Sequence, residues 1–400
     1  MNKKEYFNSV TDQVLDLKNL AAFQSKYCFD LDFLKKTLPF ENAKKIRRVI
    51  ITGCGDSYSA AGAMMLGFRK LSGLKDCNSP DIMDFCSFYT AQKICKGYTA
   101  DEVLFAGISF SGGSARVIEA LEKAKTMGIH SLLITRTPGS KGAQTAEFIM
   151  DVATPDGCNT PGLRSYYASL VGIAALGAYL GLCQGNLEQE YFRQIPTRIE
   201  KLTMDFMNGF DAIDNLMFAE ALRMKDIRKF ELIADWNEGY SAQFVEQKII
   251  ECSGAFAAHT TSEEFAHISF MARCPEEIGE IVMINEGDKS RGRMKDTING
   301  CLAQHRPTLI VTDMEPEHFD LSVNGFSGDS PYFKQEAGYN TMAERGKPVF
   351  CKIPKAPELW MSPFIDFLPG SLLAGYHAAV NEIQFFGGRY DFRTQTWNMN

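Results

Sequence analysis

The sequence predicts an α/β protein made of two doubly wound parallel-sheet domains in tandem. Three observations point to this fold. Short apolar runs alternate with helical stretches, most runs end in a turn of small residues, and the same order restarts in the second half of the chain. Parallel strands buried on both faces are continuous apolar runs, and the helices between them cover the sheet. A chain of 400 residues is long enough for two or three such domains.

In the first half, the pattern predicts four strands with helices between them. The first strand, 48–53 (RVIITG), leads into Gly-Cys-Gly and a helix of small residues from about Tyr58. The second strand, 102–109, leads through a glycine-rich turn into an amphipathic helix at 115–127. Strands at 131–135 and 148–153 follow, and then an apolar helix that includes 170–183. Strand, glycine turn, helix and strand is the order of a parallel sheet.

The second half repeats this order after a helical segment of mixed charge. We expect strands at 230–235, 280–285 and 308–313, with helices at 240–252 and 290–304. Residues 49–60 (VIITGCGDSYSA) align without gaps with residues 231–242 (ELIADWNEGYSA), and both end in Tyr-Ser-Ala after a strand. This faint repeat indicates a duplicated domain. The predicted parts are an N-terminal helical segment 1–45, a first domain 46–186, a helical linker 187–224, a second domain 225–355, and a C-terminal helix and tail 356–400.

Composition excludes several classes of protein. The 45% hydrophobic content is too high for a disordered chain, and the net charge of −7 argues against nucleic acid and anionic membranes as partners. The polar start MNKKEYFNSVTDQ has no signal-peptide pattern, and the apolar stretch 170–183 is shorter than a membrane span. The 11 cysteines are dispersed without a C-x-x-C pair, and the six histidines lack zinc-ligand spacing. We expect a soluble, cytoplasmic protein with reduced thiols and no metal.

Two loops that follow strands carry the first candidate site. The loop 53–58 lacks the third glycine of a dinucleotide fingerprint, because Tyr58 stands there, and it is not a P-loop. The loop 109–114 (SFSGGS) opens a helix and combines three hydroxyls with two glycines. Unpaired N–H groups at a helix start bind anions, so this loop favours a single phosphate. A serine-hydrolase elbow would need glycine where Ser111 stands, whereas an ordinary helix-capping turn stays possible.

The second half supplies residues that could move protons. Lys248 and Glu251 lie three apart on a predicted helix and therefore share a face, and His267 follows downstream. A carboxylate, an amine and an imidazole that meet could carry out general acid–base chemistry. From the residues alone, a solvated helix with an ion pair and a capping histidine is the simpler interpretation.

The two loops together resemble the sugar isomerase (SIS) domain family, whose loops read Gly-x-Gly-x-Ser and Ser-x-Ser-Gly-x-Thr/Ser. The resemblance implies two flavodoxin-like domains and a phosphosugar substrate. The segment 159–170 resembles the start of the last helix in such domains, with arginine in a run where relatives often carry lysine. The phosphate- and substrate-binding residues that the resemblance implies are Gly55, Ser57, Ser109, Ser111, Gly112, Gly113, Ser114 and Arg164.

The second half resembles the isomerase half of glucosamine-6-phosphate synthase and the fructose-amino-acid 6-phosphate deglycases. These proteins carry Lys-x-x-Glu or a lone Glu on this helix and a histidine sixteen residues after it, which is the spacing of Glu251 and His267. The resemblance implies that Glu251 is the base at the sugar carbons and His267 the ring-opening or leaving-group acid. Lys248 would stabilise a developing negative oxygen. It also implies a homodimer with a shared active site, and no cofactor.

Departures from the synthase narrow the expected activity. The last lysine is Lys355, so the tail 386–400 cannot supply the Schiff-base lysine of the synthase, and no glutaminase domain with a nucleophilic cysteine precedes the first domain. The tail resembles that of the deglycases instead. The loop 285–290 has lost the serine-glycine character, which predicts one phosphate site per chain. We expect a phosphosugar isomerase or deglycase acting on an amino-substituted sugar 6-phosphate. An amino-sugar-6-phosphate deaminase and a non-catalytic sugar-phosphate sensor are the alternatives.

Overall fold

A computed structural model of the chain describes residues 2–319, 321 and 348–387. The chain divides into two compact units. The first unit is Gln13–Met204, and the second is Asp205–Gly387 together with Met1–Asp12. The division falls inside helix α11 (Gln189–Asn208), within the segment 187–224 that the sequence suggested as a linker. The predicted deglycase-like tail lies outside the described residues from position 388 onward.

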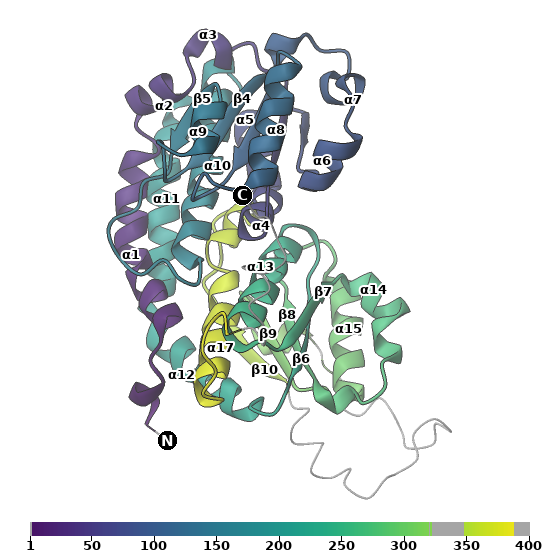
Figure 1. Cartoon of the computed structure of the whole chain (residues 1–400). Helices are drawn as coiled ribbons and strands as arrows, with labels where there is room; N and C mark the ends of the chain where they lie inside the picture. The colour runs from purple at the N-terminus through teal and green to yellow at the C-terminus, as the bar shows by residue number, and fades with distance from the viewer. Residues whose placement is uncertain (1, 320, 322–347, 388–400) are drawn as a thin grey trace, which may run out of the picture. The chain divides into compact units, whose positions relative to one another are not determined.

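The first unit is built on a five-stranded sheet with the order β2-β1-β3-β4-β5 (Figure 1). Every neighbouring pair in this sheet is parallel, and the order is that of flavodoxin-like folds. The predicted strands are all present. Their bounds, with the additional edge strand β2, are β1 Arg48–Gly53, β2 Asp76–Asn78, β3 Val103–Ile108, β4 His130–Thr135 and β5 Phe148–Asp151.

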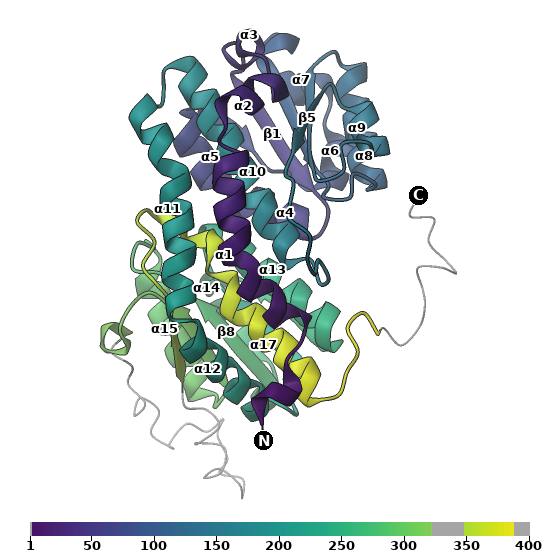
Figure 2. The same ribbon diagram turned by 90° about the vertical axis from the view of Figure 1, so that its left-hand side faces the viewer.

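Helices cover both faces of this sheet, as Figure 2 shows for α5 and α10 on one side and α6, α8 and α9 on the other. Alternate residues of β4 explain the two layers: Leu133 belongs to the core with α8, whereas Ile134 lies beside Gly172 of α10. The helices are α1 Ser9–Tyr27, α2 Leu31–Thr37, α3 Phe40–Ala43, α4 Asp56–Ala63, α5 Met65–Ser72, α6 Ile82–Phe88, α7 Ala91–Cys95, α8 Ala115–Thr126, α9 Lys141–Thr145, α10 Leu163–Gln184 and α11.

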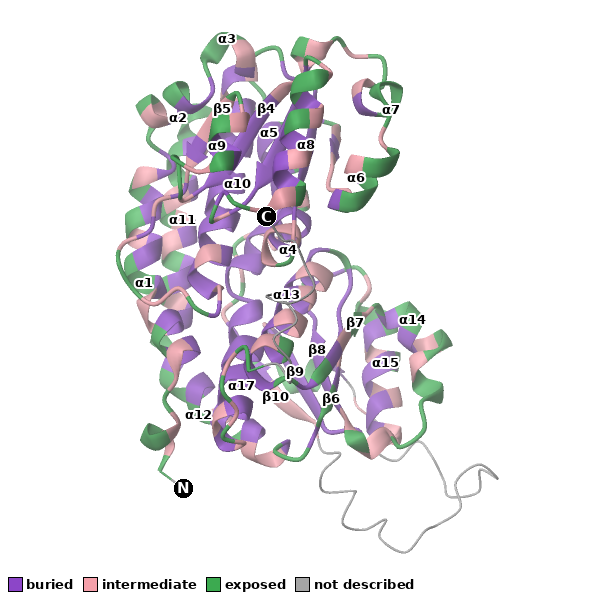
Figure 3. Ribbon diagram, viewed as in Figure 1, coloured by how far each residue is buried: buried purple, intermediate pink, exposed green. Residues whose placement is uncertain are grey.

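Helix α10 is longer than the apolar stretch 170–183 indicated. By length and composition alone its 22 residues could cross a membrane, because the helix begins before the apolar stretch. However, 94% of its most apolar window is buried inside the structure. Figure 3 colours most of α10 as buried. Small residues explain the close packing: a side chain at Gly181 would lie 2.0 Å from the Leu71 carbonyl oxygen of α5. The helix is therefore a core element of the first unit.

The second unit repeats the fold of the first. Its sheet has the order β10-β9-β8-β6-β7, and every neighbouring pair is parallel. Taken in reverse, from β7 to β10, the strands follow the same order as the first sheet. The strands are β6 Lys229–Ile233, β7 Phe256–Thr260, β8 Ile278–Met283, β9 Thr308–Thr312 and β10 Val349–Lys352. The helices are α12 Phe210–Arg223, α13 Trp236–Ser253, α14 Ser262–His267, α15 Arg291–Ala303 and α17 Phe367–Val380. The fold prediction of two doubly wound parallel domains is confirmed.

The sequence repeat has a structural cause. Its shared serine and alanine are Ser59 and Ala60 in α4 and Ser241 and Ala242 in α13, and all four are fully buried. Each pair lies in the first turns of the helix that follows the first strand of its sheet. Small residues at these positions let the helix pack closely on the strand, so the repeat marks equivalent packing sites in the two units.

Candidate functional site

The loop between β3 and α8 forms a tight turn stabilised by its own hydroxyls. Ser109 follows β3 directly, and its side-chain oxygen accepts a hydrogen bond from the Ser114 amide at 3.4 Å. The Ser111 oxygen accepts one from the Gly113 amide at 3.3 Å. Gly112 has φ +66°, a backbone conformation that favours glycine. Ser111 and Gly113 are exposed, whereas Ser109 and Gly112 are buried. The loop therefore exposes Ser111 and Gly113 on a turn that its own hydrogen bonds stabilise.

The segment after β4 supports this loop from behind. The Gly112 carbonyl accepts a hydrogen bond from the Gly142 amide at 2.9 Å, and the Phe110 carbonyl accepts one from the Arg136 amide at 3.1 Å. A side chain at position 112 would lie only 1.8 Å from the Ser140 hydroxyl oxygen. Gly112 is thus required both for its backbone conformation and for the contact with Ser140.

The first turn of α8 has no side-chain cap. Ser114 holds the N-cap position, but its hydroxyl donates to the Cys54 sulfur at 3.3 Å and does not bond an amide of the helix. Burial raises the pKa of the Cys54 thiol, so this sulfur is neutral. The amides of an uncapped helix start are an anion-binding group, because they carry the positive end of the helix dipole.

The loop after β1 lies beside the loop after β3. Gly53 pairs with Ile108 at the carboxyl ends of the two strands, and a side chain at Gly53 would meet the Ile108 carbonyl oxygen at 2.9 Å. The same side chain would lie 2.5 Å from the Ser57 Cβ. Gly55 has φ +54° and turns the chain into α4, where Ser57 is half-buried. The structure therefore brings the predicted serines and glycines of both loops to one edge of the sheet. Sequence reasoning missed the role of Gly53 in this contact.

Arg164 has a different environment from the other predicted phosphate ligands. Its side chain is fully buried in α10. Its guanidinium donates to the Pro155 carbonyl at 2.7 Å and to the Asn159 side chain at 3.1 Å, and it forms an ion pair with Asp16 at 2.8 Å. These contacts tie the segment 155–159 to the start of α10. The sequence pattern does not indicate the ion pair, because Asp16 is distant in the sequence.

Lys248 and Glu251 form an ion pair on α13, as their spacing predicted. The Lys248 side chain is 0% exposed and its ammonium lies 4.8 Å from the centre of the Phe244 ring. The Glu251 side chain is 32% exposed. A buried ammonium needs a counter-ion, and Glu251 fulfils that role while one side of its carboxylate stays open to solvent.

His267 lies at the end of α14 and is 66% exposed. Its Nε2 bonds a Glu263 oxygen at 2.9 Å, and the other oxygen of Glu263 accepts from Arg293. The hydrogen bond from Arg293 contributes most to holding the pKa of Glu263 at about 2. The three predicted proton-transfer residues therefore form two separate pairs, Lys248–Glu251 and His267–Glu263.

A buried acidic network lies where the second sheet ends, at the edge equivalent to the serine-glycine loops. The Asn285 amide, just after β8, donates to Glu238 at 3.0 Å and to Asp366 at 3.3 Å, and Ser362 donates to Glu238 at 3.1 Å. Burial raises the pKa of Glu238 to about 7 and raises that of Asp366 well above its ordinary value. This edge therefore carries buried carboxyl groups where the first unit has hydroxyls and glycines. Within the residues that the structure describes, no group of three or more His, Cys, Asp or Glu side chains could hold a metal ion.

Comparisons with known proteins agree with this description of the fold. No protein-family model matches the sequence. The structure superposes on the C-terminal domain of glucosamine-fructose-6-phosphate aminotransferase from Francisella tularensis with a TM-score of 0.73 and 16% identity, over 96% of this chain and 98% of that chain. A candidate phosphosugar isomerase from Clostridium difficile 630 gives a TM-score of 0.75 and 13% identity, over 97% of this chain and 99% of that chain. The chain has the double SIS-domain fold.

A sequence relative is similar to part of this chain. A glutamine–fructose-6-phosphate aminotransferase (isomerizing) from Pseudomonas syringae pv. tomato is 28% identical over 170 residues. The match covers 40% of this chain and 26% of that relative, so it spans about a quarter of the relative's length. The resemblance to SIS proteins that the two loops indicated is confirmed for the fold.

Proposed function

We propose that this double SIS protein is a phosphosugar isomerase-type enzyme that acts on an amino-substituted sugar 6-phosphate. The observation that carries the proposal is the loop 109–114, where the exposed Ser111 and an uncapped helix start lie on a turn that its own hydrogen bonds stabilise. The likeness to phosphosugar isomerases and to an aminotransferase that isomerises fructose 6-phosphate supports the class of substrate.

In this proposal the sugar phosphate binds the first unit. Its oxygens accept hydrogen bonds from the Ser111 and Ser57 hydroxyls and from amides at the start of α8, with Ser109 and Ser114 supporting the loop. The two glycines 112 and 113 and Gly55 let the backbone approach the ligand. Arg164 then has a supporting role, because its contacts hold the segment 155–159 next to α10. The phosphate is a fixed handle that positions the reacting carbons.

The proposed proton-transfer residues are Glu251, His267 and Lys248. Glu251 takes a proton from one of the two carbons C1 and C2 and returns it to the other, while His267 protonates the ring oxygen or the leaving amine. Lys248 pairs with the Glu251 carboxylate and is close enough to it to stabilise a neighbouring enediolate oxygen. In this proposal the enzyme is a homodimer with shared sites, in which His267, exposed on α14, reaches the active site of a second copy.

The proposal includes a choice among related reactions. Isomerisation interconverts an aldose and a ketose. A deglycase also adds water across the C–N bond to release an amine, and a deaminase releases ammonia in the same way with water. The cytoplasm is the proposed location, since all eleven cysteines are free thiols and such thiols are typical of reducing compartments. No cofactor is required, because the proton removed from one carbon is returned to the substrate.

Deuterium incorporation at C1 and C2 in heavy water tests the proposal. Fructose 6-phosphate, glucose 6-phosphate and a fructosamine 6-phosphate are the probes. We expect exchange with the wild type and at least a hundredfold loss with Glu251→Gln, in line with the contribution of a general base. Glu246→Gln on the same helix, whose carboxylate pairs with His259, is the matched control and should keep the activity. Binding of these sugars without exchange or turnover would instead support a non-catalytic sensor.

A further inference from the structure

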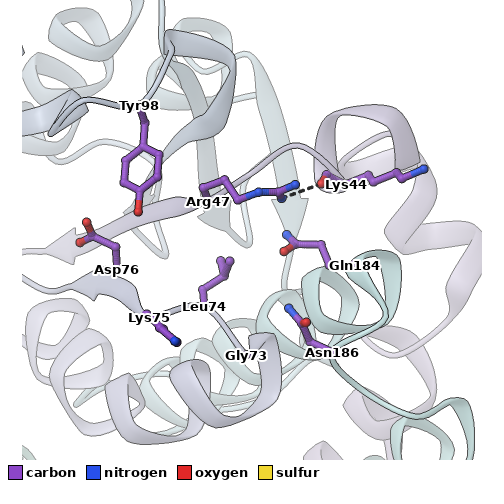
Figure 4. A pocket seen from close by; sticks show the side chains of 9 residues that line it. All are labelled: Lys44, Arg47, Gly73, Leu74, Lys75, Asp76, Tyr98, Gln184 and Asn186. Carbon is purple, nitrogen blue, oxygen red and sulfur yellow. Dashed lines mark hydrogen bonds between the residues drawn. The ribbon is translucent and has the colours of Figure 1, made fainter.

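A pocket of about 440 Å³ lies in the first unit, away from the serine-glycine loops (Figure 4). Its walls come from the segment before β1, the connection between α5 and β2, the segment before β3 and the end of α10. Arg47 directly precedes β1, and Asp76 is the first residue of β2. The strands are parallel, so this pocket lies at the amino edge of the sheet, whereas the serine-glycine loops lie at the carboxyl edge.

The lining of this pocket is positively charged in an acidic protein. Lys44, Arg47 and Lys75 contribute three cationic side chains. The one carboxylate of the lining is Asp76, and it is already paired with the buried Arg48 and with Lys96. In the described part of the chain, no salt bridge pairs a carboxylate with the three lining cations. The lining therefore carries more positive than negative charge, and the Arg47 guanidinium also donates to the Lys44 and Ile46 carbonyls at 2.8 and 3.0 Å.

Hydrogen bonds hold the walls of the pocket in position. The Gln184 amide donates to the Ala43 carbonyl at 3.0 Å and to the Ile46 carbonyl at 2.8 Å, and the Asn186 amide donates to the Ser72 carbonyl at 3.0 Å. Because these bonds use the amide nitrogens, the side-chain oxygens of Gln184 and Asn186 can accept hydrogen bonds from a ligand. Figure 4 shows the Tyr98 hydroxyl directed into the space between Asp76 and Arg47. The pocket thus combines cations with groups that bond hydroxyls.

We propose that this pocket is a second anion site, which binds the phosphate of a small phosphate ester. The Arg47 guanidinium and the Lys75 ammonium bind the phosphate oxygens, and Tyr98, Gln184 and Asn186 contact the hydroxyls of the ester. Charge-assisted hydrogen bonds from arginine and lysine are the strong contacts of phosphate sites. A volume of about 440 Å³ falls within the range of small-molecule pockets. The site is independent of the activity proposed for the serine-glycine loops.

Isothermal titration of the full chain at low ionic strength tests this site. The Ser111→Asp variant blocks the serine-glycine loop by charge, and we expect it still to bind about one equivalent of fructose 6-phosphate. Adding Arg47→Gln and Lys75→Gln should weaken this binding at least about tenfold, because two charge-assisted contacts are lost. The pair Lys18→Gln and Lys36→Gln, which removes two exposed lysines elsewhere in the unit, is the control and should change nothing.

Two further ligands define the chemistry of the site. Fructose, without phosphate, should not bind the Ser111→Asp variant. Inorganic phosphate should compete with fructose 6-phosphate, and a higher affinity for the ester supports the hydroxyl contacts. The proposal is overturned if the Ser111→Asp variant binds no phosphate compound, or if the Arg47 and Lys75 substitutions leave its affinity unchanged. Neither result bears on the turnover assay, so the two proposals fail separately.

Discussion

The ammonium of Lys248 is fully buried and bonds the Glu251 carboxylate, which is partly open to solvent. This asymmetry predicts unequal effects of removing either partner. Lys248→Met leaves a carboxylate that water can still reach, whereas Glu251→Leu leaves a buried ammonium without its counter-ion. We expect Glu251→Leu to lower the free energy of unfolding by about 3 kcal/mol, the size seen for broken buried pairs, and Lys248→Met by about half as much. Urea denaturation measures both values, and equal losses would contradict the interpretation.

Gly112 and Gly113 are adjacent but have different constraints, which gives a matched pair of variants. Gly112 has φ +66° and its added Cβ would overlap Ser140, whereas the nearest atom to a Cβ at Gly113 is the Ser111 oxygen at 3.7 Å. We expect Gly112→Ala to cost about 2–4 kcal/mol of stability and Gly113→Ala less than about 1 kcal/mol. Thermal unfolding of the two variants checks this difference. A Gly113→Ala variant as unstable as Gly112→Ala would show that the turn is constrained in another way.

Ser114 and Ser140 are both N-cap serines, but only Ser140 caps its helix. The Ser140 oxygen accepts from the Ala143 amide at 3.3 Å, whereas Ser114 donates to Cys54. Ser140→Ala should therefore cost about 1 kcal/mol of stability, and Ser114→Ala less than about 0.5 kcal/mol. In the proposed function only Ser114→Ala weakens the binding of sugar phosphates. Unfolding curves and titrations of both variants decide this, and a stability loss on Ser114→Ala would mean that the hydroxyl does cap α8.

Much of the fold could be predicted because each long strand is an apolar run with its own turn signal. The strand 48–53 matches β1 at both ends, and the loop 109–114 lies between β3 and α8 as expected. The missed strands β2 (DCN), β7 (FAAHT) and β10 (VFCK) are short or weakly apolar, and their pairing with β1, β6 and β9 stabilises them. Pairing with a distant strand leaves no local pattern to recognise.

The candidate sites, like the strands, could be predicted only where a local sequence pattern marks them. Serines and glycines that act within one loop can be found from their spacing, because the loop itself holds them together. Arg164 could not be interpreted this way, since its partner Asp16 lies in α1. The basic pocket is assembled from four separate segments, so no local sequence pattern marks it. The prediction of one phosphate site per chain rests only on loops of the serine-glycine type. The Glu238–Asp366 network also joins α13 to the start of α17 through Asn285.

Glu238 makes stability depend on pH in a direction opposite to that of a salt-bridged carboxylate. Burial raises its pKa from 4.5 to about 7 in the folded protein, so the folded state binds its proton more tightly than the unfolded state. Stability from this group is fully present below about pH 4.5 and is lost as the pH rises towards 7. Glu238→Gln is neutral at every pH, and it also removes the charge that adds to burial in raising the pKa of Asp366. We therefore expect the fall in stability between pH 5 and 7.5 to be shallower in Glu238→Gln than in the wild type. Urea denaturation at several pH values in this range measures how steeply the free energy of unfolding falls with pH, and Glu246→Gln on the same helix is the control. Equal slopes in the wild type and Glu238→Gln would mean that Glu238 is ionised when folded.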